Sequence, residues 1–203
     1  MKEFIKYTDF LAFYFYQKLA YVLLLSIKNY DFITPNKITL FALIFGIFSA
    51  YFIYVDQLFL AFLFLNFSFV FDCLDGQLAR YKKMSSEIGM WLDNIVDRIV
   101  ENLILIAIVF HYDMFEIGVI TVFINMFYSY ISDLEIYQNI KYKKLNTGEK
   151  IIFSPVYFLN RSYIIVLLSF MIFSPFLIQV LLILYGYGIF YKIYRKLNNG
   201  IIK

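Results

Sequence analysis

The chain has 203 residues, of which 62% are hydrophobic and 22% aromatic, and its formal net charge is +3. Soluble domains are usually only about 45–50% apolar, so the composition excludes an ordinary soluble protein. The single cysteine, Cys73, excludes an internal disulfide and a thiolate metal cluster. We therefore predict one all-α integral membrane domain over residues 1–203, with no nucleic-acid partner.

The first 33 residues are rich in aromatic side chains but are repeatedly interrupted by charges. The longest uncharged piece, 19–27, is too short to cross a bilayer, which takes about 20 residues. We interpret 1–33 as a juxtamembrane segment with an amphipathic helix that lies on the membrane surface. Acids precede its apolar part and no small-residue cleavage site follows, so we expect no cleaved signal peptide.

The core, residues 34–195, is predicted to contain six membrane spans. Thr34 and Pro35 indicate the start of the first helix. The 30 uncharged residues at 162–191 would overrun a bilayer as one helix, so they are interpreted as two spans that meet near Pro175. The first four spans are residues 38–55, roughly 58–80, about 86–110 and roughly 116–134.

The positions of lysine and arginine agree with this topology. None of the 18 Lys and Arg residues lies in the turns at 56–57, 111–115 and 174–176. Because cytoplasmic loops carry an excess of these residues, we expect those turns on the outer side and both chain ends in the cytoplasm. Lysines in the polar stretch 138–150 are interpreted as an orientation signal or as contacts with lipid headgroups. The expected location is the cytoplasmic membrane of a bacterium or archaeon, with the active site facing the cytoplasm.

Four aspartates lie close together in the chain at helical spacings. Asp72 and Asp75 are three residues apart, and Asp93 and Asp97 are four apart, so each pair lies on one face of a helix. Packed carboxylates repel one another unless cations neutralise them, and hard oxygen ligands suit Mg²⁺ or Mn²⁺. Two such ions can hold a diphosphate and stabilise the attacking and leaving oxygens.

The surroundings of these acids argue against four merely solvated carboxylates. Uncharged residues 58–71 lead directly into the first pair, and apolar residues 102–110 follow the second. Acids embedded in apolar sequence are costly and usually functional. Glu101, one turn beyond Asp97, either tunes the site or pairs with Arg98, and we leave it outside the core set.

The complete pattern, D-x2-D-G-x2-A-R-x8-G-x3-D-x3-D, resembles the signature of the CDP-alcohol phosphatidyltransferase family. All eight fixed positions are met, at Asp72, Asp75, Gly76, Ala79, Arg80, Gly89, Asp93 and Asp97. The segment T-P-N-K-I-T at 34–39 is similar to the one that precedes the family's first core helix. The resemblance implies a membrane enzyme that cleaves a CDP-linked alcohol and releases CMP, and it also implies a homodimer.

The same resemblance implies roles for individual residues. The four aspartates would hold two divalent ions, and Asp97 would also be the general base. The nucleotide and diphosphate pocket would be lined by Asp72, Asp75, Gly76, Ala79, Arg80 and Gly89. Asn36 and Thr39 either contact the nucleotide or cap their helix. Arg161 and Arg195 either bind an anionic acceptor or snorkel to the membrane interface.

The leading hypothesis is metal-dependent transfer of a phosphatidyl group from CDP-diacylglycerol to a small polar alcohol or polyol phosphate in a bilayer of membrane lipids. One alternative is transfer of a polar group from a soluble CDP-alcohol to a lipid or another alcohol. A distant alternative is a cation transporter, but its polar residues would usually continue across several spans. The identity of the acceptor stays open.

Overall fold

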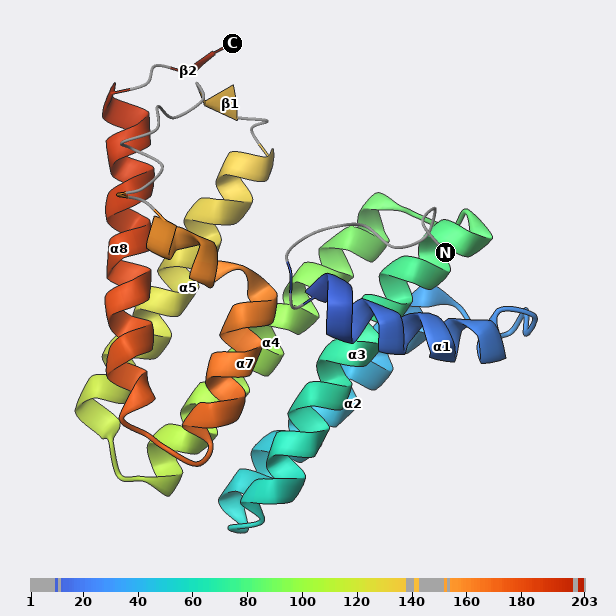
Figure 1. The fold of residues 1–203 in the computed structure, drawn as a ribbon, viewed down its shortest axis with the longest axis horizontal. Coiled ribbons are helices and arrows are strands. Elements are labelled where there is room, and N and C mark those ends of the chain that lie inside the picture. Colours follow the sequence, from blue (N-terminus) through green and yellow to red (C-terminus); the bar gives the residue numbers. More distant parts are fainter. Residues whose placement is uncertain are drawn as a thin grey trace.

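The protein is described from a computed structural model, which covers residues 10, 12–137, 141–142, 152, 154–198 and 201–202. The described part is helical apart from β1 (Lys141–Tyr142) and β2 (Ile201–Ile202), which pair antiparallel (Figure 1). The long helices are α2 (Pro35–Tyr54), α3 (Leu58–Lys82), α4 (Glu87–His111), α5 (Phe115–Tyr137) and α8 (Leu177–Asn198). The shorter ones are η1 (Ala12–Tyr16), α1 (Gln17–Ile27), η2 (Ser154–Leu159) and α7 (Arg161–Met171).

Helix starts and turns follow local sequence chemistry. Thr34 is extended before α2, and Pro35 occupies the first helical turn, as predicted, although the Thr34 side chain makes no capping hydrogen bond. Ser86 does cap α4, because its hydroxyl accepts a hydrogen bond from the Gly89 N–H at 3.0 Å. Lys83, at the end of α3, has a left-handed backbone (φ 54°), which ends the helix and reverses the chain toward α4.

The helices form a bundle in which α2, α3 and α4 pack together on one side and α5 packs with α8 on the other (Figure 1). Gly46 permits the close approach of α2 and α4, since a Cβ there would lie 2.5 Å from Val100 Cγ2. Gly188 does the same for α8, where a Cβ would lie 2.4 Å from Leu159 Cδ1. The short helix α7 contacts both α3 and α8 and so connects the two sides.

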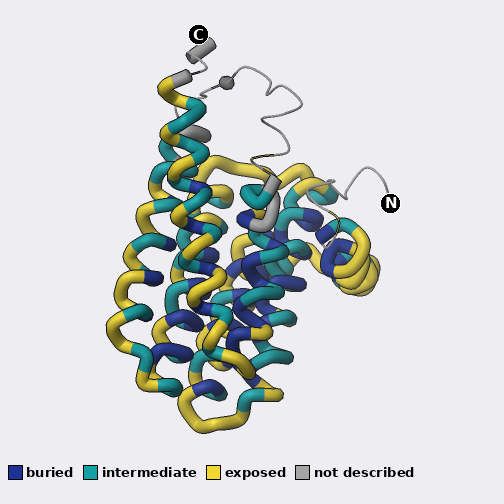
Figure 2. The backbone as a smooth tube through the Cα atoms, turned by 60° about the vertical axis from the view of Figure 1, so that its left-hand side comes forward, coloured by how far each residue is buried: buried dark blue, intermediate teal, exposed yellow. Residues whose placement is uncertain are grey.

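Four of these helices, α2, α3, α5 and α8, are long and apolar enough to cross a membrane. Their outward faces are exposed while the centre of the bundle is buried (Figure 2). Phe59, Phe123 and Ile183 illustrate this, with exposed fractions of 65%, 69% and 68%. Water would penalise such a surface and lipid would not, so the protein is an integral membrane protein.

The other two predicted spans differ from expectation in composition or length. Helix α4 has the length to cross but carries the charged residues of the motif. Helix α7 has only 11 residues, about 16 Å at 1.5 Å per residue, against a hydrocarbon core of about 30 Å. The six predicted spans thus correspond in order to six helices, of which four meet the criteria for a span.

Helix α1 lies across the bundle beside the upper part of α3 (Figure 1). One face of α1 is buried, with Ala20 and Leu24 at 0% and 1% exposure, while Val22 on the outer face is 62% exposed. Tyr16 of the adjoining η1 packs on Phe69 of α3, with ring centroids 4.6 Å apart. Residues 1–9 and 11 of the predicted juxtamembrane segment lie outside the described residues, as do 138–140 and 143–150 of the lysine-bearing stretch.

The turns divide the molecule into two ends. The α2–α3, α4–α5 and α7–α8 turns lie together at the lower end in Figure 1, and the α3–α4 turn lies toward the opposite end. The first three correspond to the turns that carry no lysine or arginine in the sequence. The motif halves adjoin the α3–α4 turn, so their side chains belong to the upper part of the bundle.

Candidate functional site

Three motif aspartates from α3 and α4, which both pack against α2, converge on one point. Asp72, Asp75 and Asp93 each offer one carboxylate oxygen, and these oxygens all lie within 4.8 Å of one another. Asp75 is only 6% exposed. The buried Oδ1 of Asp93 has no hydrogen-bond partner among the described residues. Converging hard oxygen donors with a buried oxygen left unsatisfied fit a divalent cation, which would supply the missing positive charge.

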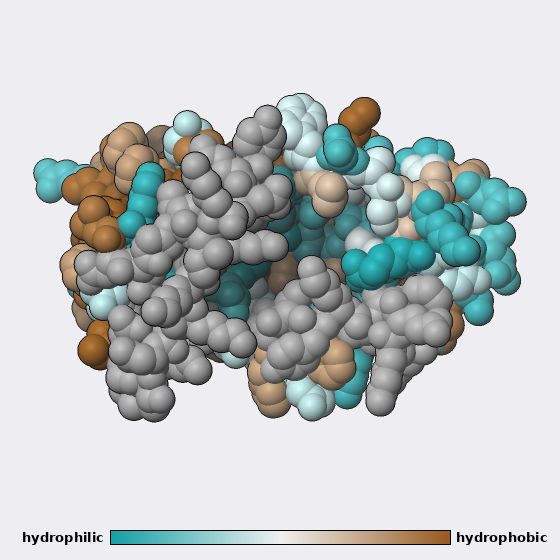
Figure 3. All heavy atoms as spheres, turned by 90° about the horizontal axis from the view of Figure 1, so that it is seen from above, coloured by the Kyte–Doolittle hydropathy of each residue, from teal (hydrophilic) through white to brown (hydrophobic). Residues whose placement is uncertain are grey.

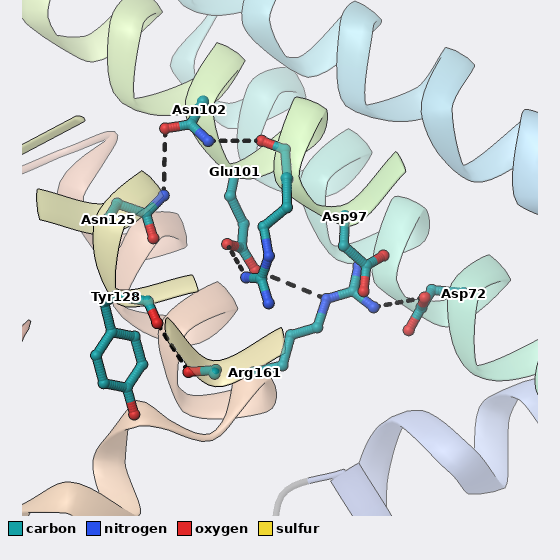
Figure 4. Close-up of polar contacts among 9 residues, drawn as sticks. Asp72, Asp97, Glu101, Asn102, Asn125, Tyr128 and Arg161 are labelled. Atoms are coloured by element: carbon teal, nitrogen blue, oxygen red, sulfur yellow. Dashed lines mark hydrogen bonds and ion pairs between the residues drawn. The ribbon is translucent and has the colours of Figure 1, made fainter. Parts of the chain in front are cut away.

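The fourth aspartate, Asp97, is connected to the cluster through an arginine. Arg161, the first residue of α7, places Nη1 2.5 Å from Asp72 Oδ1, and its Nη2 forms an ion pair with Asp97 Oδ1. The Nε of Arg161 faces Glu101 Oε1 at 3.7 Å. Figure 4 shows this guanidinium lying between side chains from α3 and α4. Arg161, which lies 64 residues beyond Asp97 in the sequence, thus contacts two of the motif aspartates directly.

Helix α2 adds two side chains from the segment at 34–39. Thr39, 3% exposed, donates its hydroxyl hydrogen bond to Asp75 Oδ2 at 2.5 Å and so orients that carboxylate. Asn36 lies beside Gly89, since a Cβ on the glycine would be 3.4 Å from Asn36 Oδ1. Thr34 occupies the cap position of α2. The capping interpretation of Asn36 and Thr39 is therefore wrong, because both lie inside the helix.

A cavity of about 370 Å³ opens at the cluster. Its walls include Asp72, Asp75, Asp93, Gly76, Arg80 and Arg161. Gly76 leaves space for the Arg80 side chain in the cavity wall, because a Cβ on the glycine would lie 3.4 Å from Arg80 Nη1. Seen from above, hydrophilic side chains surround a hollow at the centre of the molecule (Figure 3). The remaining predicted site residues of the motif and of α2 do not line this cavity: Ala79, Gly89, Asp97, Asn36 and Thr39.

A second polar cavity, of about 210 Å³, lies on the other side of Arg161. It is lined by Arg98, Glu101, Ser129 and Tyr185 among others. Glu101 is 1% exposed, and its Oε2 accepts a hydrogen bond from Arg98 Nη1 at 3.0 Å. The Ser129 and Tyr185 hydroxyls are buried with no hydrogen-bond partner among the described residues.

The sequence alone did not identify this second cavity. Its one visible signal is Glu101, which continues the Asp93–Asp97 face by another four residues. A hydrogen-bonded chain leads from it into α5: Asn102 Nδ2 donates to the Arg98 carbonyl at 2.7 Å, and Asn125 Nδ2 donates to Asn102 Oδ1 at 3.3 Å (Figure 4). Serine, asparagine and tyrosine residues on separate helices have no spacing that would reveal such a network.

The second predicted acceptor arginine, Arg195, lies elsewhere. It is on the last turns of α8, where its guanidinium stacks on Tyr191 and Nη1 is 3.1 Å from the Tyr191 hydroxyl. It lines neither of the two polar cavities. The structure thus brings Arg161 to the aspartates and leaves Arg195 outside their immediate surroundings.

Membrane-crossing helices that aim carboxylates and arginines into one cavity define an integral membrane protein whose polar site is suited to divalent cations and anionic groups. The particular family is then fixed by comparison, because residues 32–187 match the model of the CDP-alcohol phosphatidyltransferase family. The chain belongs to this family, as the motif predicted. Divalent-metal binding agrees with the carboxylate cluster.

Two curated relatives come from Aquifex aeolicus (strain VF5). An uncharacterized protein is 35% identical over 118 residues, which are 57% of this chain and 60% of the relative. A bifunctional IPC transferase and DIPP synthase is 35% identical over 81 residues, 40% of this chain and 19% of the relative. The matches therefore span less than two thirds of either relative.

Two crystal structures of Mycobacterium tuberculosis phosphatidylinositol phosphate synthase share the fold, each with a TM-score of 0.60. One, with CDP-DAG bound, is 19% identical and aligns with 93% of this chain and 97% of its own. The other, in complex with manganese and citrate, is 18% identical and aligns with 93% of this chain and 92% of its own. At these identities the likeness concerns the fold.

Proposed function

We propose that the protein transfers a phosphatidyl group from CDP-diacylglycerol to the hydroxyl of a small polar alcohol or polyol phosphate, with release of CMP. The observation that carries this proposal is the convergence of Asp72, Asp75 and Asp93 within 4.8 Å at a polar cavity. A diphosphate needs cations on its oxygens to be attacked, and this cluster is suited to hold them.

In this proposal, some residues of the cavity bind the donor and Asp97 accepts a proton. Two ions, Mg²⁺ or Mn²⁺, would be held by the four motif aspartates, Asp72, Asp75, Asp93 and Asp97. Once bound, they would neutralise the charge of the diphosphate. Gly76 and Arg80 lie along the cavity wall and bind phosphate oxygens. Asp97 takes the proton of the acceptor hydroxyl as general base. The acceptor oxygen then bonds to the lipid-bearing phosphorus, and the bond from that phosphorus to the CMP oxygen breaks.

An apolar cavity of about 400 Å³ between α1, α3 and α7 supports a lipid-linked donor. It is lined by Phe15, Leu19, Phe67 and Phe170 among others. It adjoins the aspartate cavity where η1 meets α3, because Tyr16 of η1 lines the apolar cavity and packs on Phe69 of α3, which lines the aspartate cavity. Acyl chains bury their surface favourably against such walls, whereas a soluble CDP-alcohol would leave them empty.

The acceptor side is assigned to Arg161, with Arg195 as a more distant contributor. Arg161 can grip a phosphate through two N–H groups, which favours an anionic polyol phosphate. Its position beside Asp97 supports this role, because the base must reach the acceptor hydroxyl. Arg195 contacts Tyr191 on α8, so its role would require an acceptor that extends toward that helix.

We further propose that residues 1–203 form one domain with six spans and a juxtamembrane helix in the cytoplasmic membrane. The packing of α4 against α2, α5 and α7 supports its crossing despite its charges. The arrangement of α1 across the bundle supports a surface position. The polar cavity would then face the cytoplasm, where the lysine-rich ends lie.

The test is an acceptor panel. The purified protein is incubated in lipid vesicles with Mg²⁺ or Mn²⁺, labelled CDP-diacylglycerol and candidate alcohols, and CMP release and product lipid mass are measured. We expect CMP release with one acceptor class and none from the Asp72→Asn variant. Product only from soluble CDP-alcohols would favour the alternative donor, and cation flux without CMP release would favour a transporter.

A further inference from the structure

Arg161, together with its neighbour Asn160, lies between the two polar cavities. It lines the cavity of about 370 Å³ that holds the aspartate cluster and also the cavity of about 210 Å³ that holds Glu101. Its two terminal nitrogens contact Asp72 and Asp97, while its Nε faces Glu101 Oε1 at 3.7 Å. One guanidinium therefore serves three carboxylates on two sides (Figure 4).

Glu101 contacts two arginines, Arg98 through Oε2 and Arg161 through Oε1. Arg98 donates to Oε2 at 3.0 Å, which leaves Oε1 turned to Arg161. That Oε1 is buried and has no hydrogen-bond partner among the described residues. A carboxylate that is 1% exposed within a membrane helix is costly unless it is paired, and the 3.7 Å ion pair with Arg161 leaves Oε1 able to take a closer contact with that guanidinium.

The Arg161 guanidinium and a divalent metal ion would compete for the same carboxylate oxygens. Asp72 Oδ1 and Asp97 Oδ1 hold Arg161 in this structure, and both residues belong to the proposed metal site. An oxygen in contact with a guanidinium nitrogen is screened from a divalent cation. Metal binding through these two oxygens therefore requires Arg161 to give up those contacts, and Glu101 is a carboxylate within reach that can keep the guanidinium paired.

We propose that Glu101 is a positioning residue that retains Arg161 on the acceptor side when Asp72 and Asp97 turn to a divalent cation. This inference rests on the proposed metal site. By offering Arg161 an alternative partner, Glu101 weakens its competition with the metal. The same contact keeps a phosphate-binding guanidinium at the wall between the cavities rather than leaving a buried charge unpaired.

The test is Mn²⁺ binding to the purified full chain, followed by electron paramagnetic resonance without substrate or turnover. Glu101→Gln should weaken Mn²⁺ binding about tenfold, in the range of couplings between contacting charged residues. Arg161→Gln should tighten it by a similar factor. In the Arg161→Gln background, the added Glu101→Gln change should have no further effect, because the residue through which Glu101 acts is gone.

Two control variants distinguish the positioning of Arg161 by Glu101 from a direct electrostatic effect of the Glu101 charge on the metal. Glu101→Asp keeps the charge but withdraws the carboxylate from Arg161, so it too should weaken Mn²⁺ binding. Glu87→Gln removes a charge from the exposed first turn of α4 and should change nothing. Each variant is checked for a monodisperse elution profile and a cooperative thermal transition, and Arg161→Gln decides alone if neither Glu101 variant folds.

Several outcomes would overturn the inference. Equal weakening by Glu101→Gln with and without Arg161 would indicate a direct field effect. Unchanged or weaker Mn²⁺ binding by Arg161→Gln would show that this arginine does not compete with the metal. A wild-type protein that binds no Mn²⁺ would refute the metal site and the inference together, whereas Mn²⁺ binding without CMP release would refute only the proposed reaction.

Discussion

The hydrogen bond from Thr39 to Asp75 gives the most direct test of how the site is built. Thr39→Val keeps the shape of the side chain and removes only the hydroxyl, which lies 2.5 Å from Asp75 Oδ2. Both residues are almost fully buried, at 3% and 6% exposure, so water cannot replace the lost donor. Asp75 then loses the contact that fixes its orientation toward the metal cluster.

The expected loss is about 10- to 100-fold in kcat/KM, the usual effect of removing the partner that orients a metal ligand. This corresponds to about 1.4–2.7 kcal/mol of transition-state stabilisation. It agrees with the roughly 1.5–3 kcal/mol of a hydrogen bond to a charged group. The assay is CMP release from CDP-diacylglycerol in the presence of Mg²⁺, with Thr39→Ser expected to restore most of the activity.

Thr121→Val is the matched control. Thr121 is also fully buried in a membrane helix, but its hydroxyl donates at 2.7 Å to the Ile117 carbonyl of its own helix α5. The same chemical change there should leave kcat/KM within about twofold, because it lies outside the ligand set. If Thr39→Val were as active as Thr121→Val, the contact with Asp75 would not orient a functional carboxylate.

Four further outcomes are expected. Asp93→Asn should abolish turnover and weaken metal-dependent nucleotide binding, because it removes a converging carboxylate; wild-type activity in excess chelator would contradict this. Asp97→Asn should lower turnover by roughly 10²–10⁴-fold with little change in donor binding, and a loss below about tenfold would exclude it as the base. Arg161→Ala should raise the KM for an anionic acceptor about 10- to 100-fold and leave the donor KM nearly unchanged, because charge-assisted hydrogen bonds to the acceptor are lost; parallel shifts in both values would refute an acceptor role. A reporter fused after Lys203 should read as cytoplasmic, and a signal from the opposite side would refute the predicted topology of six spans with both chain ends in the cytoplasm.

The membrane class and the motif helices could be predicted from the sequence because they depend on local patterns. Uncharged stretches of span length predicted α2, α3 and α5 within a few residues. The three- and four-residue spacings placed each aspartate pair on one helix face. Since α3 and α4 are joined by a short turn near Lys83, the two aspartate pairs belong to the adjoining halves of these helices.

The contacts across the bundle depended on tertiary structure. The sequence predicts that Arg161 either binds an anionic acceptor or snorkels to the interface, and nothing in its neighbourhood indicates that it contacts Asp72 and Asp97 from α7. The pairing of Thr39 with Asp75 and the cavity around Glu101 likewise join helices whose relative rotation no spacing encodes. Helical periodicity fixes which residues share a face, whereas side-chain packing between helices decides which faces meet.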